Sequence, residues 1–161
     1  MITMKVAGDQ ELTASMRAAP GKALAAGTSA LNMWATELAG YIKVEKLSGN
    51  PLNRRSGRLS ASVHPVVVEQ GDTVSGGAAA GAGVPYAKIH EFGGLIPAHV
   101  VVAKNAQALA IPLPGGTIFR KSASIPDVQM PERSYMRSSL REEGPDGIAQ
   151  LKAAVMEAVL A

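Results

Sequence analysis

The sequence predicts a mixed fold, in which helices near both ends of the chain flank a region of antiparallel strands. Apolar residues recur every three or four positions between Leu24 and Ile42, which is the spacing of a long amphipathic helix. Two strand-like segments flank Gly71-Asp72, and this pattern predicts a hairpin. Helical spacing returns from Ile148 onwards. No internal repeat or second domain is visible, so residues 1–161 are expected to form a single domain.

Length and composition predict a domain with a thin core. A chain of 161 residues, of which 47% are apolar, is long enough to bury a core of its own. The apolar residues are mostly Ala and Val, and the aromatic residues comprise one Trp, three Tyr and two Phe. Small side chains bury little apolar area, so association with other subunits would help to stabilise such a fold.

Charge and the N-terminal segment bear on the class of protein. The net charge of +3 comes from dispersed basic residues, and it permits contact with nucleic acid without arguing for it. The absence of cysteine fits a reducing cytoplasm or a chain that needs no disulfides. No apolar run approaches the roughly 20 residues of a membrane helix. Residues 1–6 lack the apolar region of a signal peptide. We expect no membrane partner.

The first third of the chain is predicted to be largely helical. Residues 2–6 suit a short strand, and Asp9 suits the N-cap of a helix over residues 10–18. Pro20 is expected to break or restart that helix. A longer helix then ends near Lys46, because Ser48-Gly49-Asn50-Pro51 stops it. Its apolar stripe comprises Leu24, Thr28, Leu31, Ala35, Leu38 and Ile42, with Trp34 and Tyr41 beside it.

A polar, basic segment over residues 53–62 precedes the strands. Arg54, Arg55 and Arg58 lack interleaved aromatic residues, so a solvated loop leading into a sheet is favoured over a loop that binds phosphate or acid. The hairpin is then expected to pair residues 62–70 with residues 73–80. Its second strand is rich in Gly and Ala, which would let another backbone approach closely.

The segment from Val84 to Gly94 combines a turn signal, a helical turn and two glycines. The helical turn is expected over residues 85–92, and Gly93 and Gly94 can end it with positive φ. Because large side chains are scarce, we expect Tyr86 and Phe92 to be largely buried. Phe92 is expected to pack near two later residues, Tyr135 and Met136.

The pair His90-Glu91 suggests a zinc protease but fails the pattern. That chemistry requires a second His four positions on, and Gly94 stands there instead. His64 and His99 lie in expected strands without ligand spacing, and no nucleophile elbow or phosphate-binding loop is present. We expect no catalytic residue, no cofactor and no metal, and we assign His90 to packing or a hydrogen bond. A hydrolase that uses His90 and Glu91 is the least favoured interpretation.

Residues 95–130 are expected to form an extended β-arm. Val100-Val101-Val102 can pair with residues 108–111 across Asn105-Ala106, and a Pro- and Gly-rich loop over residues 112–116 precedes a strand at residues 117–121. Prolines favour edge strands over central ones. A helix is then expected to start at Pro131-Glu132, with a break at residues 144–147 before the last helix. The apolar residues of that last helix are Ile148, Leu151, Val155 and Val159.

Three segments, in this order, resemble a known family. The first is Ser56-Gly57-Arg58-Leu59-Ser60-Ala61-Ser62, the second Tyr86-Ala87-Lys88-Ile89-His90-Glu91-Phe92-Gly93-Gly94, and the third Pro131-Glu132-Arg133-Ser134-Tyr135-Met136. They resemble the tail completion or virion morphogenesis proteins of long-tailed bacteriophages, from about residue 20 onwards. The residues expected to form interface or structural motifs are Ser56, Gly57, Leu59, Ser62, Tyr86, His90, Glu91, Phe92, Gly93, Pro131, Arg133, Tyr135 and Met136.

The sequence departs from the family pattern in the third motif and in the arm. Ser134 stands where that family usually has Pro, and Tyr135 and Met136 stand in the places of Phe and Leu. The aromatic-then-aliphatic character is kept, so the packing is expected to be preserved. The arm is longer than in short relatives, and residues 109–112 with Ile125-Pro126 resemble the longer virion-morphogenesis branch.

The resemblance implies an α+β domain, in which a long N-terminal helix and a C-terminal helix pack on a small, mainly antiparallel sheet. It implies a structural virion protein of the neck or tail that completes the tail and joins it to the head connector. The implied form is a homo-oligomeric ring, six-fold favoured, assembled in the host cytoplasm. Its partners would be the head connector and tail terminator or tail tube proteins, with DNA passing through the lumen and no small-molecule substrate. The alternative is a nucleic-acid-binding module that uses the basic loop from Arg54 to Arg58.

Overall fold

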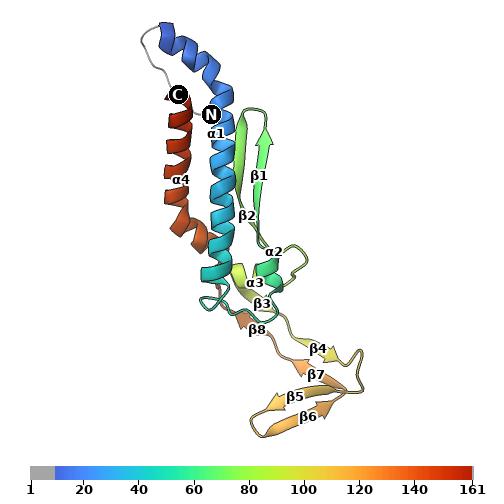
Figure 1. Ribbon diagram of the computed structural model, residues 1–161. Coiled ribbons are helices and arrows are strands. Elements are labelled where there is room, and N and C mark those ends of the chain that lie inside the picture. Colours follow the sequence, from blue (N-terminus) through green and yellow to red (C-terminus); the bar gives the residue numbers. More distant parts are fainter. Residues whose placement is uncertain (1–9, 161) are drawn as a thin grey trace.

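The protein is an α+β domain, in which one long helix carries a second helix on one side and a β-hairpin on another (Figure 1). The computed structural model describes residues 10–160, and their side chains from Pro20 onwards. The expected strand at residues 2–6 and the expected Asp9 cap lie outside the described residues. The long helix α1 spans Gln10–Tyr41 and continues into a short π-helix, η1, at Ile42–Lys46. The helix α4 spans Met136–Leu160.

The predicted apolar stripe of α1 forms the centre of the core. Leu31, Ala35, Leu38 and Ile42 are buried, whereas Leu24 and Thr28 are half-buried. The largest fully buried side chains are Ile42, Val63 and Ser139, which confirms a thin core. The core cluster comprises Leu31, Trp34, Leu38, Ala39, Ile42, Leu47, Leu52, Val63 and Tyr135.

Both helices continue through a proline, so the expected breaks at Pro20 and at residues 144–147 are wrong. Figure 1 shows the N-terminal part of α1 inclined to the rest of the helix, and α4 bends close to its start. A proline removes one helical hydrogen bond and favours a kink, but tertiary packing can keep the helix continuous. In α4 that packing comes from Trp34, whose Nε1 donates to the Glu143 carbonyl oxygen at 3.2 Å. Gly147 makes room for the indole, because a Cβ there would lie 2.2 Å from Trp34 Nε1.

The β1–β2 hairpin has nearly the predicted bounds. β1 spans His64–Gln70 and β2 spans Thr73–Ala79, paired antiparallel around Gly71, whose φ is +56°. The glycines of β2 do allow a close approach. A Cβ on Gly76 would lie 2.8 Å from the Val66 carbonyl oxygen and 3.1 Å from the Leu31 side chain on α1.

The basic segment contains a short helix that the sequence did not predict. α2 spans Arg58–Ser62 and follows Gly57, whose φ is +75°. The Ser62 hydroxyl donates to the Leu59 carbonyl oxygen at 2.7 Å and accepts from the Gly81 amide at 2.9 Å. These two bonds connect the first motif to the end of the hairpin.

The arm is a series of nested antiparallel pairs, and its predicted pairing is wrong. β3 (Gly94–Ile96) pairs with β8 (Val128–Met130), and β4 (His99–Val102) pairs with β7 (Ser122–Ile125). At the tip, β5 (Leu109–Leu113) pairs with β6 (Gly116–Arg120). The chain therefore reverses at Pro114-Gly115 rather than at Asn105-Ala106, helped by a φ of +129° at Gly116.

The second and third motifs meet where the arm leaves the body. α3 spans Ala87–Phe92, which confirms the helical turn, but α4 begins at Met136 and not at Pro131. The expected burial of Tyr86 and Phe92 is also wrong, because they are 37% and 60% exposed. The reason is geometric: Ala87 and Glu91, four positions apart on α3, occupy its inward side instead.

Candidate functional site

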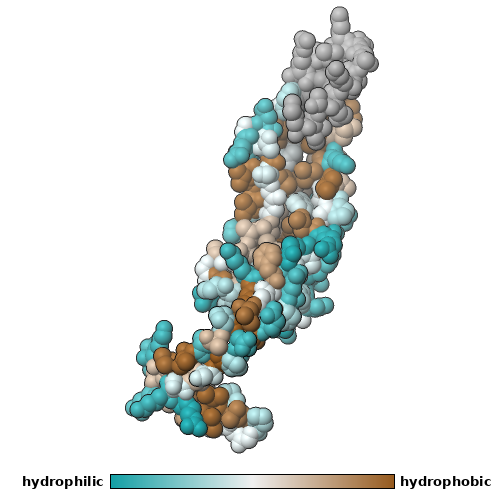
Figure 2. All heavy atoms as spheres, turned by 180° about the vertical axis from the view of Figure 1, so that it is seen from behind, coloured by the Kyte–Doolittle hydropathy of each residue, from teal (hydrophilic) through white to brown (hydrophobic). Residues whose placement is uncertain are grey.

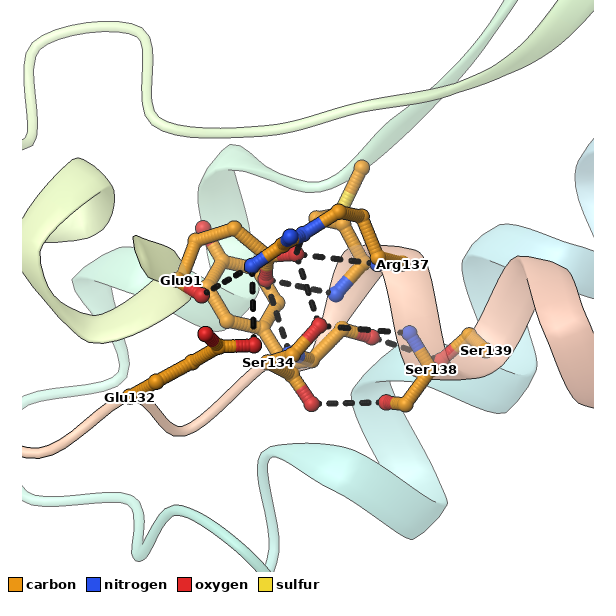
Figure 3. Close-up of polar contacts among 8 residues, drawn as sticks. Glu91, Glu132, Ser134, Arg137, Ser138 and Ser139 are labelled. Atoms are coloured by element: carbon orange, nitrogen blue, oxygen red, sulfur yellow. Dashed lines mark hydrogen bonds and ion pairs between the residues drawn. The ribbon is translucent and has the colours of Figure 1, made fainter. Parts of the chain in front are cut away.

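Glu91 is a buried acidic residue at the junction of α3 and α4. Its carboxylate accepts hydrogen bonds from the backbone amides of Tyr135, Met136 and Arg137 at 2.8, 2.9 and 3.0 Å (Figure 3). The hydroxyl of Ser134 donates a fourth bond at 2.8 Å. The first amides of a helix have no partner within the helix, and the helix dipole makes that end positive. Glu91 therefore caps α4 from a distant part of the chain.

Arg137 balances the buried charge. Its Nε donates to Glu91 Oε1 at 3.1 Å, and its Nη2 donates to the Glu91 carbonyl oxygen at 3.0 Å and to Glu132 Oε1 at 2.9 Å (Figure 3). We call Glu91, Ser134, Arg137 and the backbone amides of residues 135–137 the Glu91 clamp. Burial alone would raise the pKa of Glu91, but the amides of Met136 and Arg137 and the Ser134 hydroxyl together lower it. The carboxylate is therefore ionised at neutral pH.

Ser134 links the buried carboxylate to the first turn of α4. Its hydroxyl both donates to Glu91 and accepts from the Ser138 amide at 3.3 Å, so it bridges the carboxylate and the first turn of α4. A proline at this position has no hydroxyl for either bond. The Ser134 hydroxyl thus adds two contacts to the clamp.

The backbones of the second and third motifs also touch. The Arg133 amide donates to the His90 carbonyl oxygen at 2.8 Å. Gly93 has a φ of +66°, and a Cβ there would lie 2.8 Å from the Glu132 backbone nitrogen and 3.0 Å from the Met130 carbonyl oxygen. Gly93 is therefore required both by its conformation and by the close approach of the neighbouring chain.

The two aromatic residues of the second motif lie outside the core. Phe92 stacks under Arg137, whose guanidinium carbon lies 4.6 Å from the ring centroid. Such a cation–π contact adds modestly to stability at an exposed site. The Tyr86 ring meets His90 edge-on, with ring centroids 5.8 Å apart.

A cleft of about 460 Å³ lies beside the clamp, and residues of all three motifs line it. The first motif contributes through α2 and the loop before it, the second through α3, and the third through Arg133. The lining residues are Leu47, Leu52, Asn53, Arg54, Arg55, Ser56, Gly57, Leu59, Ser60, Tyr86, His90 and Arg133.

The predicted motif residues gather at one end of the helical body, where α2, α3 and β3 lie together (Figure 1). Tyr135 is 2% exposed and belongs to the core, and Met136 packs against that core. Burial, followed by the Glu91 charge, raises the pKa of Tyr135 to about 12. Ser62 is half-buried and does not line the cleft, whereas Pro131 is exposed.

Sequence reasoning missed the partners of Glu91 and the role of Trp34. The scarcity of aromatic residues drew the prediction to Tyr86 and Phe92, whereas the buried contact is made by a carboxylate. One signal was present: Ala87 and Glu91 have the spacing of one helical side, and Pro131 precedes a helix whose first amides need an acceptor.

The residues that the structure describes give no sign of a metal site, because no three His, Cys, Asp or Glu gather there in a way that could hold an ion. Within residues 10–160 no helix is long and apolar enough to cross a membrane. Comparison with protein-family models, curated proteins and solved structures finds no match to this chain.

Proposed function

We propose that the protein is a structural subunit of a bacteriophage neck or tail. In this proposal it completes the tail and joins it to the head connector as a homo-oligomeric ring, with six-fold symmetry favoured. The order of the three motifs suggests this role, and the observation that carries it is the arm, a projecting β-ribbon (Figure 1) with several large apolar side chains exposed.

The arm exposes large apolar side chains along its length. Leu95, Val100, Leu113 and Phe119 are 57%, 62%, 50% and 69% exposed. Figure 2 shows hydrophobic and hydrophilic residues interleaved on the arm. An isolated two-stranded ribbon is only marginally stable in water, and exposed apolar strands favour pairing with other chains. These features suit an element that is stabilised against a neighbouring subunit.

The body offers surfaces that such an arm can complete. Among the described residues, β1 and β2 form a sheet of two strands without a third. The outer edges of that sheet are therefore free to accept a strand from another copy. A head-to-tail contact of this kind closes into a ring when the rotation between subunits is right.

The Glu91 clamp gives the arm a defined root. β3 directly follows α3, β8 leads to α4, and the clamp joins those two helices. Both ends of the ribbon are thus fixed at one place. A ribbon fixed in this way suits a specific contact with a neighbouring subunit better than a flexible loop would.

The mass of the purified protein at micromolar concentration, and of the subunit in assembled particles, tests the proposal. We expect a closed ring that Phe119→Ser weakens, with helix content unchanged by circular dichroism. Met33→Ser is the matched control, because Met33 is 62% exposed on α1, away from the arm. A monomer under both conditions, or equal effects of the two variants, would contradict the proposal.

A nucleic-acid-binding module is the second candidate, favoured by the arginines of the basic loop that line the cleft. Affinity from phosphate contacts falls steeply with salt because counterions are released. Assembly through apolar and backbone contacts persists at moderate salt. Measuring DNA binding and ring formation over the same salt series separates the two candidates.

A further inference from the structure

The cleft between the three motifs carries positive charge that the described side chains leave without an ion pair. Among the residues whose side chains are described, the guanidinium groups of Arg54, Arg55 and Arg133 form no ion pair, whereas Arg137 and Lys46 do. Among the described residues, Arg54 donates hydrogen bonds only to two hydroxyls, Ser60 Oγ at 3.2 Å and Ser48 Oγ at 3.5 Å. No Asp or Glu lines the cleft.

The rest of the cleft lining combines three leucines and Gly57 with the polar residues Asn53, Ser56, Ser60, Tyr86 and His90. Leu47 and Leu52 are buried at 3% and 7% exposure, and Leu59 packs against the same core. His90 lines the cleft, and its Nδ1 is buried without a hydrogen-bond partner among the described residues. An occupant would therefore combine an aliphatic side chain with a negative charge.

The arm of this protein contains one segment with that chemistry. Asp127 is the single acidic residue between positions 95 and 130, and it lies between Pro126 and Val128. Asp127 is exposed and Val128 is 38% exposed. No ion pair to Asp127 occurs among the described side chains.

We propose that the cleft binds the Ile125–Val128 segment of a second copy of this chain. The Asp127 carboxylate is held by Arg55 and Arg133, and Val128 lies over the leucines of the cleft. This assignment rests on the proposed ring, and it names the contact by which one subunit recognises the next. Arginine pairs well with carboxylates because its planar group donates two parallel hydrogen bonds.

A nucleic-acid occupant fits the cleft less well. Single-stranded nucleic acid is held by cations spread along a track with exposed aromatic faces for stacking. Here the arginines line one open cleft instead of a track, and the aromatic ring that lines it, Tyr86, is engaged with His90.

A charge exchange in the full-length protein tests the assignment. We expect Arg133→Asp and Asp127→Arg to weaken ring assembly about tenfold or more each, because each places like charges in contact. The double variant is expected to recover most of that loss. Arg55→Gln is a second probe, since its guanidinium makes no hydrogen bond within the described chain and its loss leaves the fold intact. Asp72→Arg, in the β1–β2 turn, is the control and is expected to assemble normally.

The outcomes separate this contact from the ring itself. If Phe119→Ser dissolves the ring but Asp127→Arg does not, the ring stands and the occupant of the cleft is wrong. Failure of the double variant to recover assembly also overturns the contact, provided that its melting temperature is unchanged. If single-stranded DNA at 150 mM salt (about physiological ionic strength) binds wild type but not Arg133→Asp, the cleft is a nucleic-acid site instead.

Discussion

A single carboxylate, that of Glu91, connects the second motif to the third motif and the start of α4. Glu91→Ala leaves the first amides of α4 and the Ser134 hydroxyl without their acceptor, whereas Arg137 keeps Glu132 and the backbone carbonyl of residue 91. Loss of a helix cap typically costs roughly 0.5–2 kcal/mol, and the ion pair adds at most about 1 kcal/mol because the Arg137 side chain is 49% exposed. Chemical denaturation measures the loss. Glu132→Ala is the control, because its side chain is 54% exposed and a surface pair contributes at most about 1 kcal/mol.

Equal losses of unfolding free energy for Glu91→Ala and Glu132→Ala would contradict the stabilising role of the Glu91 clamp. Phe92→Ala is also expected to cost about 1 kcal/mol or less, because Phe92 is 60% exposed and contributes mainly its contact with Arg137. A buried Phe92, as the sequence predicted, would have cost more stability on truncation to Ala.

The Glu91 clamp also makes stability depend on pH. The folded protein lowers the pKa of Glu91, so the unfolded state binds protons more readily. The stabilisation is complete above the pKa of the unfolded carboxyl, about 4.3, and is lost as the pH falls through the lower folded pKa. The free energy of unfolding of the wild type should therefore fall below about pH 4. Glu91→Gln should be less stable at neutral pH and show a shallower decline with acid; parallel curves would contradict this assignment.

Gly147 is required by one neighbour, the Trp34 indole. Gly147→Ala places a methyl group 2.2 Å from Trp34 Nε1, so the indole or α4 must shift. Overpacking of this kind typically costs about 1–3 kcal/mol. Gly144→Ala is a matched control in the same helix, because its Cβ would meet nothing closer than 3.9 Å. That control should be neutral or stabilising, since Ala favours helix over Gly; thermal unfolding with Trp fluorescence compares the pair.

At the scale of elements, local signals were predictable and distant contacts were not. The β1–β2 hairpin follows from strand-like segments around Gly71-Asp72, and the stripe of α1 follows from its periodicity. The predicted strand pairing of the arm was wrong because it depends on where the chain reverses. Two turn candidates compete, Pro114-Gly115 and Asn105-Ala106. The continuity of α4 through Pro145 depends on Trp34, more than a hundred residues earlier, and no local pattern contains that contact.

The same limit applies to the site. Each motif was visible along the sequence, but its chemistry lies between motifs. The cleft combines Arg55, His90 and Arg133 from three segments, and the cap of α4 comes from α3. Sequence spacing reveals a pair such as His90-Glu91 but cannot show which of its members turns inward.

The arm should be the first element that a protease cuts in an isolated subunit. Residues 97–127 contribute nothing to the core cluster, and most of their side chains are exposed. Elements with few buried contacts open more easily than the body. Limited trypsin digestion is expected at Lys104, Arg120 or Lys121, followed by mass spectrometry. Assembly should protect these sites from cleavage. Equal cleavage in isolated and assembled forms would show that the arm is not part of the interface between subunits.

For the whole molecule, the prediction is that body and arm are separable in folding but not in function. Ile96 and Val128 are partners in the β3–β8 pair, so replacing residues 97–127 by Asn-Gly closes that pair with a two-residue hairpin turn. The core around α1, the hairpin and the Glu91 clamp stay intact, so the shortened protein should fold with a similar melting temperature. It should also remain monomeric where the full chain assembles. If the shortened protein still forms rings, its body contacts suffice for assembly, and the arm must instead reach another component of the particle.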